Sequence, residues 1–313
     1  MNKILSIFLF FFLFSSVLFF STRSENQDKL KVDRYLYTLH KIYFENIFID
    51  YQKYSIQDLY NYFSESLKQK NTDQAFRETL YKFVEDPYLE IKNREIFESN
   101  YYRERRVEED LKVEFFEQQN VRICYISLLN LSPNMGKKYR EYLKNKIDEE
   151  TVIIIDLTNN FGGSLWTAAF FIALFFEPNT YLFSTNFKKK DGVKTYNFYS
   201  SEEYGGYFSK NFVAVLQDET TASSAEVISG VLKTRALVFG NLTYGKPYIQ
   251  SIIDIENLTV VYTNGFASFS LDLNPHDRVK PDFYLTDEEI SRKIIRTMVF
   301  KIYFSLRTMT DGG

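Results

Sequence analysis

Short apolar runs alternate with helical stretches from residue 112 to the end of the chain. Residues 152–155 and 212–216 are unbroken apolar runs of strand length, which is typical of buried strands. Residues 134–147 and 164–176 are interpreted as helices that follow such runs. Alternation of this kind predicts an α/β core.

Further strands and a final helix complete this half of the chain. Residues 180–199 predict a hairpin with its turn at Asp191-Gly192, a dipeptide that suits tight hairpin turns, and lysines 188–190 beside it are interpreted as a solvated tip. Residues 252–255 and 258–262 predict a second pair of strands. The sequence T-D-E-E at 286–289 predicts the start of a helix that runs to about residue 307.

The first third of the chain does not show this alternation of strands and helices. Residues 33–110 are polar and aromatic, and the pattern predicts helices, one of them opened by a capping box at Ser55 and Asp58. Another helix follows Thr72 and stops near Asp86-Pro87. Residues 90–110 are rich in both signs of charge and are interpreted as a solvated linker or helix face.

An uncharged apolar run occupies residues 4–20. Its length lies between that of a signal-peptide core and that of a short membrane span. We expect an export signal, with an uncleaved N-terminal membrane anchor as the alternative. The protein is therefore expected to be periplasmic or extracellular, and association with a membrane through residues 4–20 stays open.

Composition excludes several classes of function. The net charge of −3 gives no argument for nucleic-acid binding. The only cysteine, Cys124, lies in a probable strand and is interpreted as a buried hydrophobe. No histidine, cysteine and carboxylate spacing indicates a metal site, so we expect neither a metal nor another cofactor.

A candidate nucleophile lies where the apolar run 212–216 leads, through T-A-S-S-A-E at 221–226, into a helical stretch. Ser223 would stand at this strand-to-helix turn, near free N–H groups that stabilise a growing oxyanion. A serine at a helix start is also a common N-cap, so the motif alone does not establish catalysis.

A serine nucleophile needs a base, and the two histidines, His40 and His276, lie in no motif that supplies one. Lys246 has apolar neighbours and no carboxylate within four residues on either side. Burial there would lower its pKa, as a lysine base requires. Gln250, four residues further, could orient the lysine without charging it.

These two segments resemble the motifs of the C-terminal processing peptidases, also called tail-specific proteases. The family's nucleophile motif is similar to T-A-S-S-A-E, and its lysine motif T-F-G-K-G-x-x-Q is similar to T-Y-G-K-P-Y-I-Q at 243–250. The resemblance implies that Ser223 is the nucleophile, Lys246 the base and Gln250 the residue that orients it. The spacing from Ser223 to Lys246 is 23 residues, about two shorter than the family's, and the shortening falls near the turn at 233–235.

Two more motifs support the resemblance. D-L-T-N-N-F-G-G at 156–163 resembles D-L-R-x-N-P-G-G, and R-V-K-P-D at 278–282 resembles the closing G-I-x-P-D. The resemblance implies that the N–H of Gly162 or Gly163 and the N–H of Ser224 form the oxyanion hole. Thr158 stands in place of arginine and Phe161 in place of proline, which leaves the shape of this loop open.

The PDZ domain that many relatives carry has no room in this chain. V-E-D-P-Y at 84–88 resembles the segment that precedes that domain, but only about thirty residues separate it from the strand near Val121. Selectivity for C-terminal tails is therefore not implied. The resemblance implies a crotonase-like α/β core of mixed strands and helices at 112–313, preceded by a small helical region and linker at 29–111 and by the signal or anchor at 1–22.

The prediction is an exported serine endopeptidase that hydrolyses peptide bonds through an acyl-enzyme. Its partner is a peptide or protein substrate and not a nucleic acid, and assembly into a homo-oligomer stays open. The alternative is a non-catalytic ligand- or peptide-binding module on the same scaffold, because relatives of this core include retinoid-binding proteins.

Overall fold

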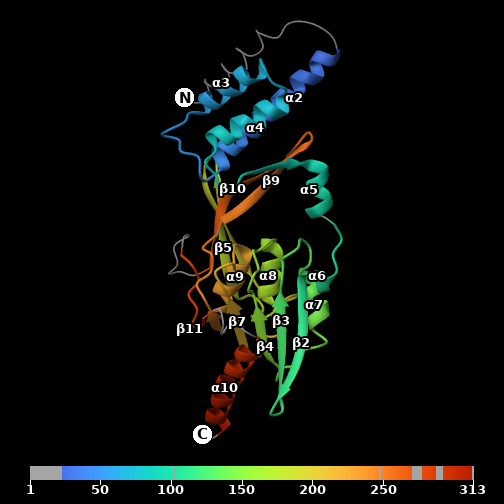
Figure 1. Ribbon diagram of the computed structural model, residues 1–313, viewed down its shortest axis with the longest axis vertical. Coiled ribbons are helices and arrows are strands. Elements are labelled where there is room, and N and C mark those ends of the chain that lie inside the picture. The colour runs from blue at the N-terminus through green and yellow to red at the C-terminus, as the bar shows by residue number, and fades with distance from the viewer. Residues whose placement is uncertain (1–22, 102, 247, 270–276, 287–291, 312–313) are drawn as a thin grey trace.

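The computed structural model describes residues 23–101, 103–246, 248–269, 277–286 and 292–311. The expected signal or anchor at 1–22 lies outside the described residues. None of the described helices combines the length and the apolar character that crossing a membrane requires. Figure 1 shows an elongated molecule with the N-terminal helices at one end and the C-terminal helix at the other.

A six-stranded sheet forms the centre of the larger part, and its strands run in the order β11-β8-β7-β4-β3-β2. Neighbouring strands are parallel except for the β2–β3 pair, which is antiparallel. The strands are β2 (Leu111–Gln118), β3 (Val121–Leu128), β4 (Val152–Asp156), β7 (Val213–Gln217), β8 (Leu237–Gly240) and β11 (Phe283–Tyr284).

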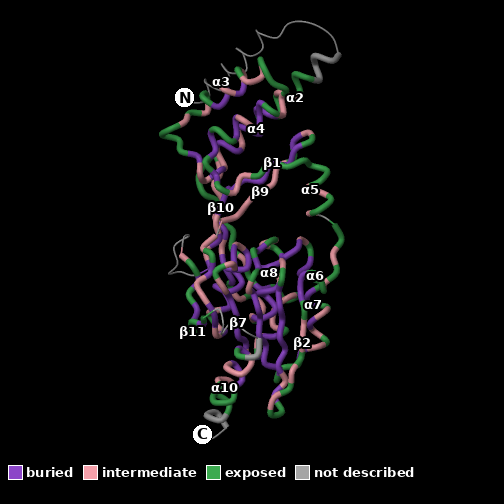
Figure 2. Tube along the Cα trace, viewed as in Figure 1, coloured by how far each residue is buried: buried purple, intermediate pink, exposed green. Residues whose placement is uncertain are grey.

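Both faces of this sheet are covered, which explains why its central strands are continuous apolar runs. Ile153 and Ile155 of β4 face a core shared with α7 (Gly136–Leu143), α8 (Leu165–Ala173) and α9 (Ser224–Leu232). Val152 and Ile154 face a second core that α10 (Arg292–Asp311) covers. Figure 2 shows the buried residues concentrated along these strands. The predicted α/β fold is confirmed.

Cys124 lies on β3 and is fully buried. Burial raises the pKa of its thiol to about 12, so the thiolate that a nucleophile needs is suppressed. The interpretation of this cysteine as a buried hydrophobe is confirmed.

A second sheet is antiparallel and lies above the first in the view of Figure 1. Its strands are β1 (Glu90–Asn93), β5 (Tyr181–Lys189), β6 (Gly192–Tyr199), β9 (Tyr248–Ile255) and β10 (Leu258–Ser268). The central strand β10 pairs with β9 along one edge and with β1 and then β5 along the other. The predicted hairpin with its turn at Asp191-Gly192 is confirmed by the β5–β6 pair.

The N-terminal region contains α2 (Arg23–Glu45), α3 (Ile56–Leu67), α4 (Thr72–Phe83), α5 (Arg94–Tyr101) and α6 (Val107–Asp110). The capping box predicted before α3 is confirmed, because Ser55 and Asp58 exchange hydrogen bonds there. The apolar faces of α2, α3 and α4 share one core with β9 and β10, including Val260 and Tyr262. This region is therefore packed onto the second sheet.

Two expectations for exposed segments are wrong. Residues 90–93 form the strand β1 in the second sheet, where a linker or helix face was expected. The lysines beside the hairpin turn are not simply solvated: Lys188 donates to the carbonyl of Asn46 at 2.7 Å, and Lys189 pairs with Glu45 at 3.0 Å. Both differences arise because the N-terminal region folds back onto the second sheet.

Candidate active site

Ser223 occupies a strained turn between β7 and α9. Its backbone angles are φ 57° and ψ −127°, a conformation that residues with a side chain rarely adopt. Such strain costs about 1–3 kcal/mol and persists only where surrounding contacts hold it. The Ala222 N–H donates to the Asn160 carbonyl at 3.0 Å, and the Ser223 N–H donates to Glu226 Oε2 at 2.9 Å.

The hydroxyls of the two adjacent serines differ in their surroundings. Ser223 is partly exposed, and no hydrogen bond from its Oγ to the described residues caps α9. Ser224 is buried, and its Oγ donates to the Gly163 carbonyl at 3.1 Å. Of the two hydroxyls, the geometry favours that of Ser223 as the reactive group.

The glycine loop lies directly against the serine turn. Gly162 and Gly163 have φ angles of 97° and 143°, and a Cβ on Gly162 would lie 2.8 Å from the Ser223 Cβ. The Gly162 N–H is already used, because it donates to Asn160 Oδ1 at 2.8 Å. Within the described part of the chain, the N–H groups of Gly163 and Ser224 donate to no protein acceptor. These two groups are therefore the pair available to an oxyanion.

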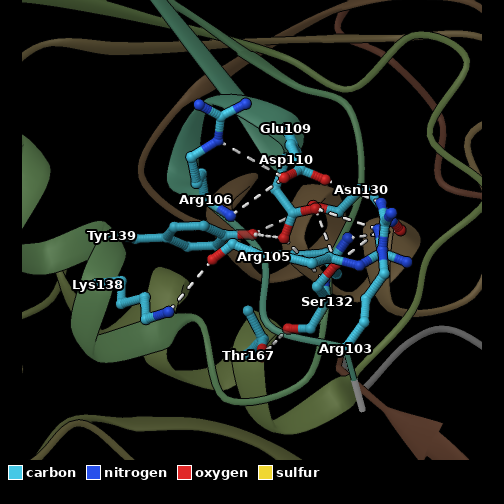
Figure 3. Close-up of polar contacts among 11 residues, drawn as sticks. Arg103, Arg105, Arg106, Glu109, Asp110, Asn130, Ser132, Lys138, Tyr139 and Thr167 are labelled. Atoms are coloured by element: carbon cyan, nitrogen blue, oxygen red, sulfur yellow. Dashed lines mark hydrogen bonds and ion pairs between the residues drawn. The ribbon is translucent and has the colours of Figure 1, made fainter. Parts of the chain in front are cut away.

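A polar network around the buried Asp110, drawn in Figure 3, lies next to the segment on which the glycine loop rests. Asp110 is fully buried and accepts hydrogen bonds from the Ser132 hydroxyl and the Tyr139 hydroxyl, both at 2.8 Å. The carbonyl of Leu131, next to Ser132, accepts the Ser164 N–H at 2.6 Å. A Cβ on Gly163 would meet the same Leu131 carbonyl at 2.3 Å. Asp110 thus helps to hold the segment on which the glycine loop rests.

The charge-rich segment before the first sheet contributes to this network. Arg105 Nη1 lies 3.7 Å from the Asp110 carboxylate, and the Arg105 side chain is 22% exposed. The interpretation of residues 90–110 as a solvated stretch is wrong at these two positions. Nothing in the local sequence distinguished Asp110 from its neighbouring acidic residues, because its hydrogen-bond partners come from the loop after β3 and from α7.

Glu226 joins the serine turn to the lysine turn. Its side chain is buried, and its Oε2 accepts the N–H of Ser223 at 2.9 Å and that of Lys246 at 2.7 Å. Its Oε1 accepts the Gly245 N–H at 2.6 Å. One carboxylate therefore fixes both turns. The sequence assigned no role to Glu226, and the only signal was its place three residues after Ser223.

The closing motif at 278–282 supports the loop that leads to the lysine. The Val279 N–H donates to Thr243 Oγ1 at 2.8 Å, and the Thr243 N–H donates to the Val279 carbonyl at 3.3 Å. The Tyr244 N–H donates to the Thr221 carbonyl at 2.9 Å. The structure thus brings all four motifs of the sequence together around one turn.

The Lys246 ammonium lies in a partly buried position among residues from three segments. Its Nζ is 3.5 Å from Gln250 Oε1 and 4.0 Å from the centre of the Tyr88 ring. Burial lowers the pKa of Lys246, while the negative charges of Glu90, Asp86 and Glu226 act in the opposite direction. No carboxylate lies close to Lys246 in the sequence, but the fold brings three carboxylates close enough to act on its charge.

The backbone N–H groups of Ser223 and Lys246 share one acceptor, Glu226 Oε2, but the side chains of the two residues are not joined. Within the described residues, no hydrogen bond joins Ser223 Oγ to Lys246 Nζ. Catalytic hydrogen bonds are often long or poorly aligned before substrate binds. In this structure the Lys246 side chain therefore forms its hydrogen bond with Gln250 and none with Ser223.

Comparison with protein families identifies the core. The model of peptidase family S41 matches residues 122–285, slightly more than half of the chain. The chain belongs to peptidase family S41. The S41 match contains the serine turn, the glycine loop and the lysine turn, and the N-terminal region lies outside it.

Curated relatives match the S41 core and not the whole of their own length. The chain is 27% identical to the chloroplastic carboxyl-terminal-processing peptidase 2 of Arabidopsis thaliana over 139 residues, which are 44% of this chain and 26% of that protein. It is 27% identical to a carboxyl-terminal-processing protease of Picosynechococcus sp. over 145 residues, 45% of this chain and 33% of that protein. The matched part thus spans a third or less of either relative. The resemblance to C-terminal processing peptidases is confirmed.

A solved structure resembles the chain over more of its length. It is a lipoprotein from Streptococcus agalactiae with a TM-score of 0.60 and 18% sequence identity, and the match covers 86% of this chain and 94% of that one. At this identity the likeness shows a shared fold. It extends beyond the S41 match at 122–285 and therefore includes part of the chain outside the core.

Proposed function

We propose that this chain is an exported serine peptidase that uses Ser223 as its nucleophile and Lys246 as its base. The observation that carries the proposal is the Glu226 carboxylate, which ties the N–H of Ser223 to that of Lys246 in a buried site. This contact explains how a strained, partly exposed serine and a lysine from another loop are kept side by side.

The reaction begins when neutral Lys246 accepts the proton of Ser223 Oγ. The oxygen attacks the carbonyl carbon of the peptide bond and forms a tetrahedral intermediate, whose negative oxygen is bound by the free N–H groups of Gly163 and Ser224. The intermediate collapses, the C–N bond breaks, and Lys246 returns the proton to the leaving amine. Neutral Lys246 then takes a proton from a water molecule that attacks the acyl carbon, the bond from that carbon to Ser223 Oγ breaks, and Lys246 returns the proton to Ser223.

Gln250 has the role of orienting the base. Its Oε1 faces Lys246 Nζ at 3.5 Å, while its Nε2 donates to the carbonyl of Tyr88 at 2.9 Å. The second bond fixes which amide atom faces the lysine. An amide oxygen accepts a hydrogen bond from lysine without adding a charge that would stabilise the ammonium.

The substrate and the location of the protein follow from weaker signals. The family and its named relatives support a peptide or protein substrate. The apolar run at 4–20 supports export, with or without retention of that run as a membrane anchor. We expect no cofactor, because the steps above use only groups of the protein, the substrate and water.

The function is tested with the full-length protein and an unfolded substrate such as casein. Ser223→Ala should abolish cleavage, whereas Ser224→Ala should retain it to within about tenfold, because alanine keeps the backbone N–H that binds the oxyanion. The readout is the rate at which new amino termini form. A dead Ser224→Ala variant would move the nucleophile by one residue, and absence of cleavage by the folded wild-type protein would favour the binding module.

A further inference from the structure

Tyr88 contacts both the proposed base and the residue that orients it. It lies between α4 and β1, outside the part of the chain that matches the S41 model. The centre of its ring is 4.0 Å from Lys246 Nζ, and its carbonyl accepts Gln250 Nε2 at 2.9 Å. One residue of the N-terminal region thus fixes two groups of the core.

Tyr88 is itself held firmly by a buried carboxylate. Asp86 Oδ1 accepts the Tyr88 N–H at 2.9 Å, and Asp86 Oδ2 accepts the side-chain amide of Asn46 at 2.9 Å and the N–H of Thr263 at 2.7 Å. Asn46 follows α2, and Thr263 belongs to β10. The position of the Tyr88 ring is therefore set by the way the N-terminal region packs onto the second sheet.

Aromatic packing restrains the ring further. The ring of Tyr248, at the start of β9, lies 5.7 Å from that of Tyr88, and both contact the ring of Phe48. Lys246 lies in the loop before β9, two residues ahead of Tyr248, which begins that strand. A shift of this cluster would therefore move the ring relative to the ammonium.

Burial lowers the pKa of Lys246, and the groups that face its ammonium oppose that effect because they stabilise the protonated form. An aromatic face attracts a cation, and the carboxylates of Glu90, Asp86 and Glu226 act in the same direction. The hydroxyls of Tyr244 and Tyr248 complete the titratable groups near the ring of Tyr88. While Lys246 is protonated it cannot accept the proton of Ser223, because the ammonium has no free electron pair.

We propose that Tyr88 is a positioning residue for Lys246: its ring and its carbonyl hold the ammonium and the Gln250 amide in a resting arrangement, so that the packing of the N-terminal region controls when the base reaches Ser223. The proposal rests on the proposed Ser-Lys function and deepens it. The N-terminal region thereby becomes part of the regulation of the site.

The test is the pH dependence of kcat/KM for the full-length protein with Tyr88→Leu. Leucine removes the aromatic face and keeps the carbonyl that binds Gln250. Because the ring stabilises the ammonium, its loss lowers the pKa of Lys246, and the midpoint of the pH–rate profile should move to lower pH by about half to one and a half units. The rate below the midpoint should rise by roughly three- to thirtyfold.

Two further variants keep the shape of the ring. Tyr88→Phe should keep the wild-type midpoint, because phenylalanine presents a similar aromatic face. A trifluorinated phenylalanine at position 88 should shift the midpoint as leucine does, because fluorine withdraws electron density from that face. This variant tests the proposal even where Tyr88→Leu destabilises the fold.

The matched control is Tyr62→Leu. Lys82 Nζ lies 3.8 Å from the centre of the Tyr62 ring, so the substitution removes a similar contact in the same region but away from the site. It should leave the midpoint unchanged. Thermal melts show whether each variant is folded.

The proposal is overturned if folded Tyr88→Leu and the trifluorinated variant keep the wild-type midpoint, whether or not their rates fall. A second readout separates this from a failure of the proposed function. The pKa of Lys246 can be measured by NMR on protein labelled with ¹³C at lysine Cε, with Lys246→Arg to assign the signal. If wild type cleaves nothing, this titration still shows whether Tyr88→Leu lowers that pKa.

Discussion

Lys246→Arg should abolish peptide cleavage although it keeps the positive charge. Arginine does not deprotonate in proteins, so it cannot take the proton of Ser223 Oγ. Loss of a general base costs about 10²–10⁴-fold in rate, and loss of the only activator of the serine should reach the upper end of that range. Lys246→Ala should be equally inactive. The measurement is kcat/KM for casein or a peptide derived from it.

The matched control is Lys210→Arg. Lys210 is exposed and pairs with Glu149 at 3.2 Å, an interaction that arginine can keep. This variant should cleave at the wild-type rate. Near-normal turnover of Lys246→Arg would mean that the lysine acts as a fixed charge, and the proposed mechanism would be wrong.

The pH profile of the wild type follows from the same argument. Burial lowers the pKa of Lys246 below the ordinary value of lysine, and the neutral form is the active one. The rate should therefore rise with pH along a single limb whose midpoint lies below that ordinary value of about 10.4.

Glu226→Gln should inactivate the site through its geometry. The buried carboxylate accepts three backbone N–H groups, and an amide has only one oxygen. Whichever way the amide turns, its NH₂ group faces at least one N–H donor. Each unsatisfied buried group costs about 1–3 kcal/mol, which should lower the melting temperature by a few degrees. Because both turns depend on this carboxylate, turnover should fall by about a hundredfold or more.

Glu219→Gln supplies the control for this variant. Glu219 is exposed on the loop that leads from β7 to Ser223, so the same chemical change there should alter neither stability nor rate. A Glu226→Gln protein with a lowered melting temperature but normal turnover would restrict Glu226 to a structural role.

Much of the core could be predicted from the sequence because its signals are local. The apolar runs of β4 and β7 are continuous since both faces of the central sheet are covered. The serine, glycine and lysine motifs each follow a strand, and the fold gathers them at one place. The choice between Gly162 and Gly163 could not be made in advance, because the side chain of Asn160 decides which N–H is free.

The surroundings of Lys246 could not be predicted because they come from distant parts of the chain. Gln250 and Tyr88 are 162 residues apart in sequence, yet they are joined by a hydrogen bond. Asp86 and Glu90 reach the ammonium only because the N-terminal region packs onto the second sheet. Local spacing gives no information about such contacts, and for the same reason β1 was missed.

The central claim is that Ser223 is an activated nucleophile, and it can be tested without knowledge of the substrate. A fluorophosphonate probe reacts only with a serine whose hydroxyl is deprotonated by a nearby base, and mass spectrometry locates the adduct. The account predicts a single adduct on Ser223 that persists in Ser224→Ala and is lost in Lys246→Arg. Absence of any adduct on the folded wild-type protein across the pH range, or an adduct on another serine, would contradict it.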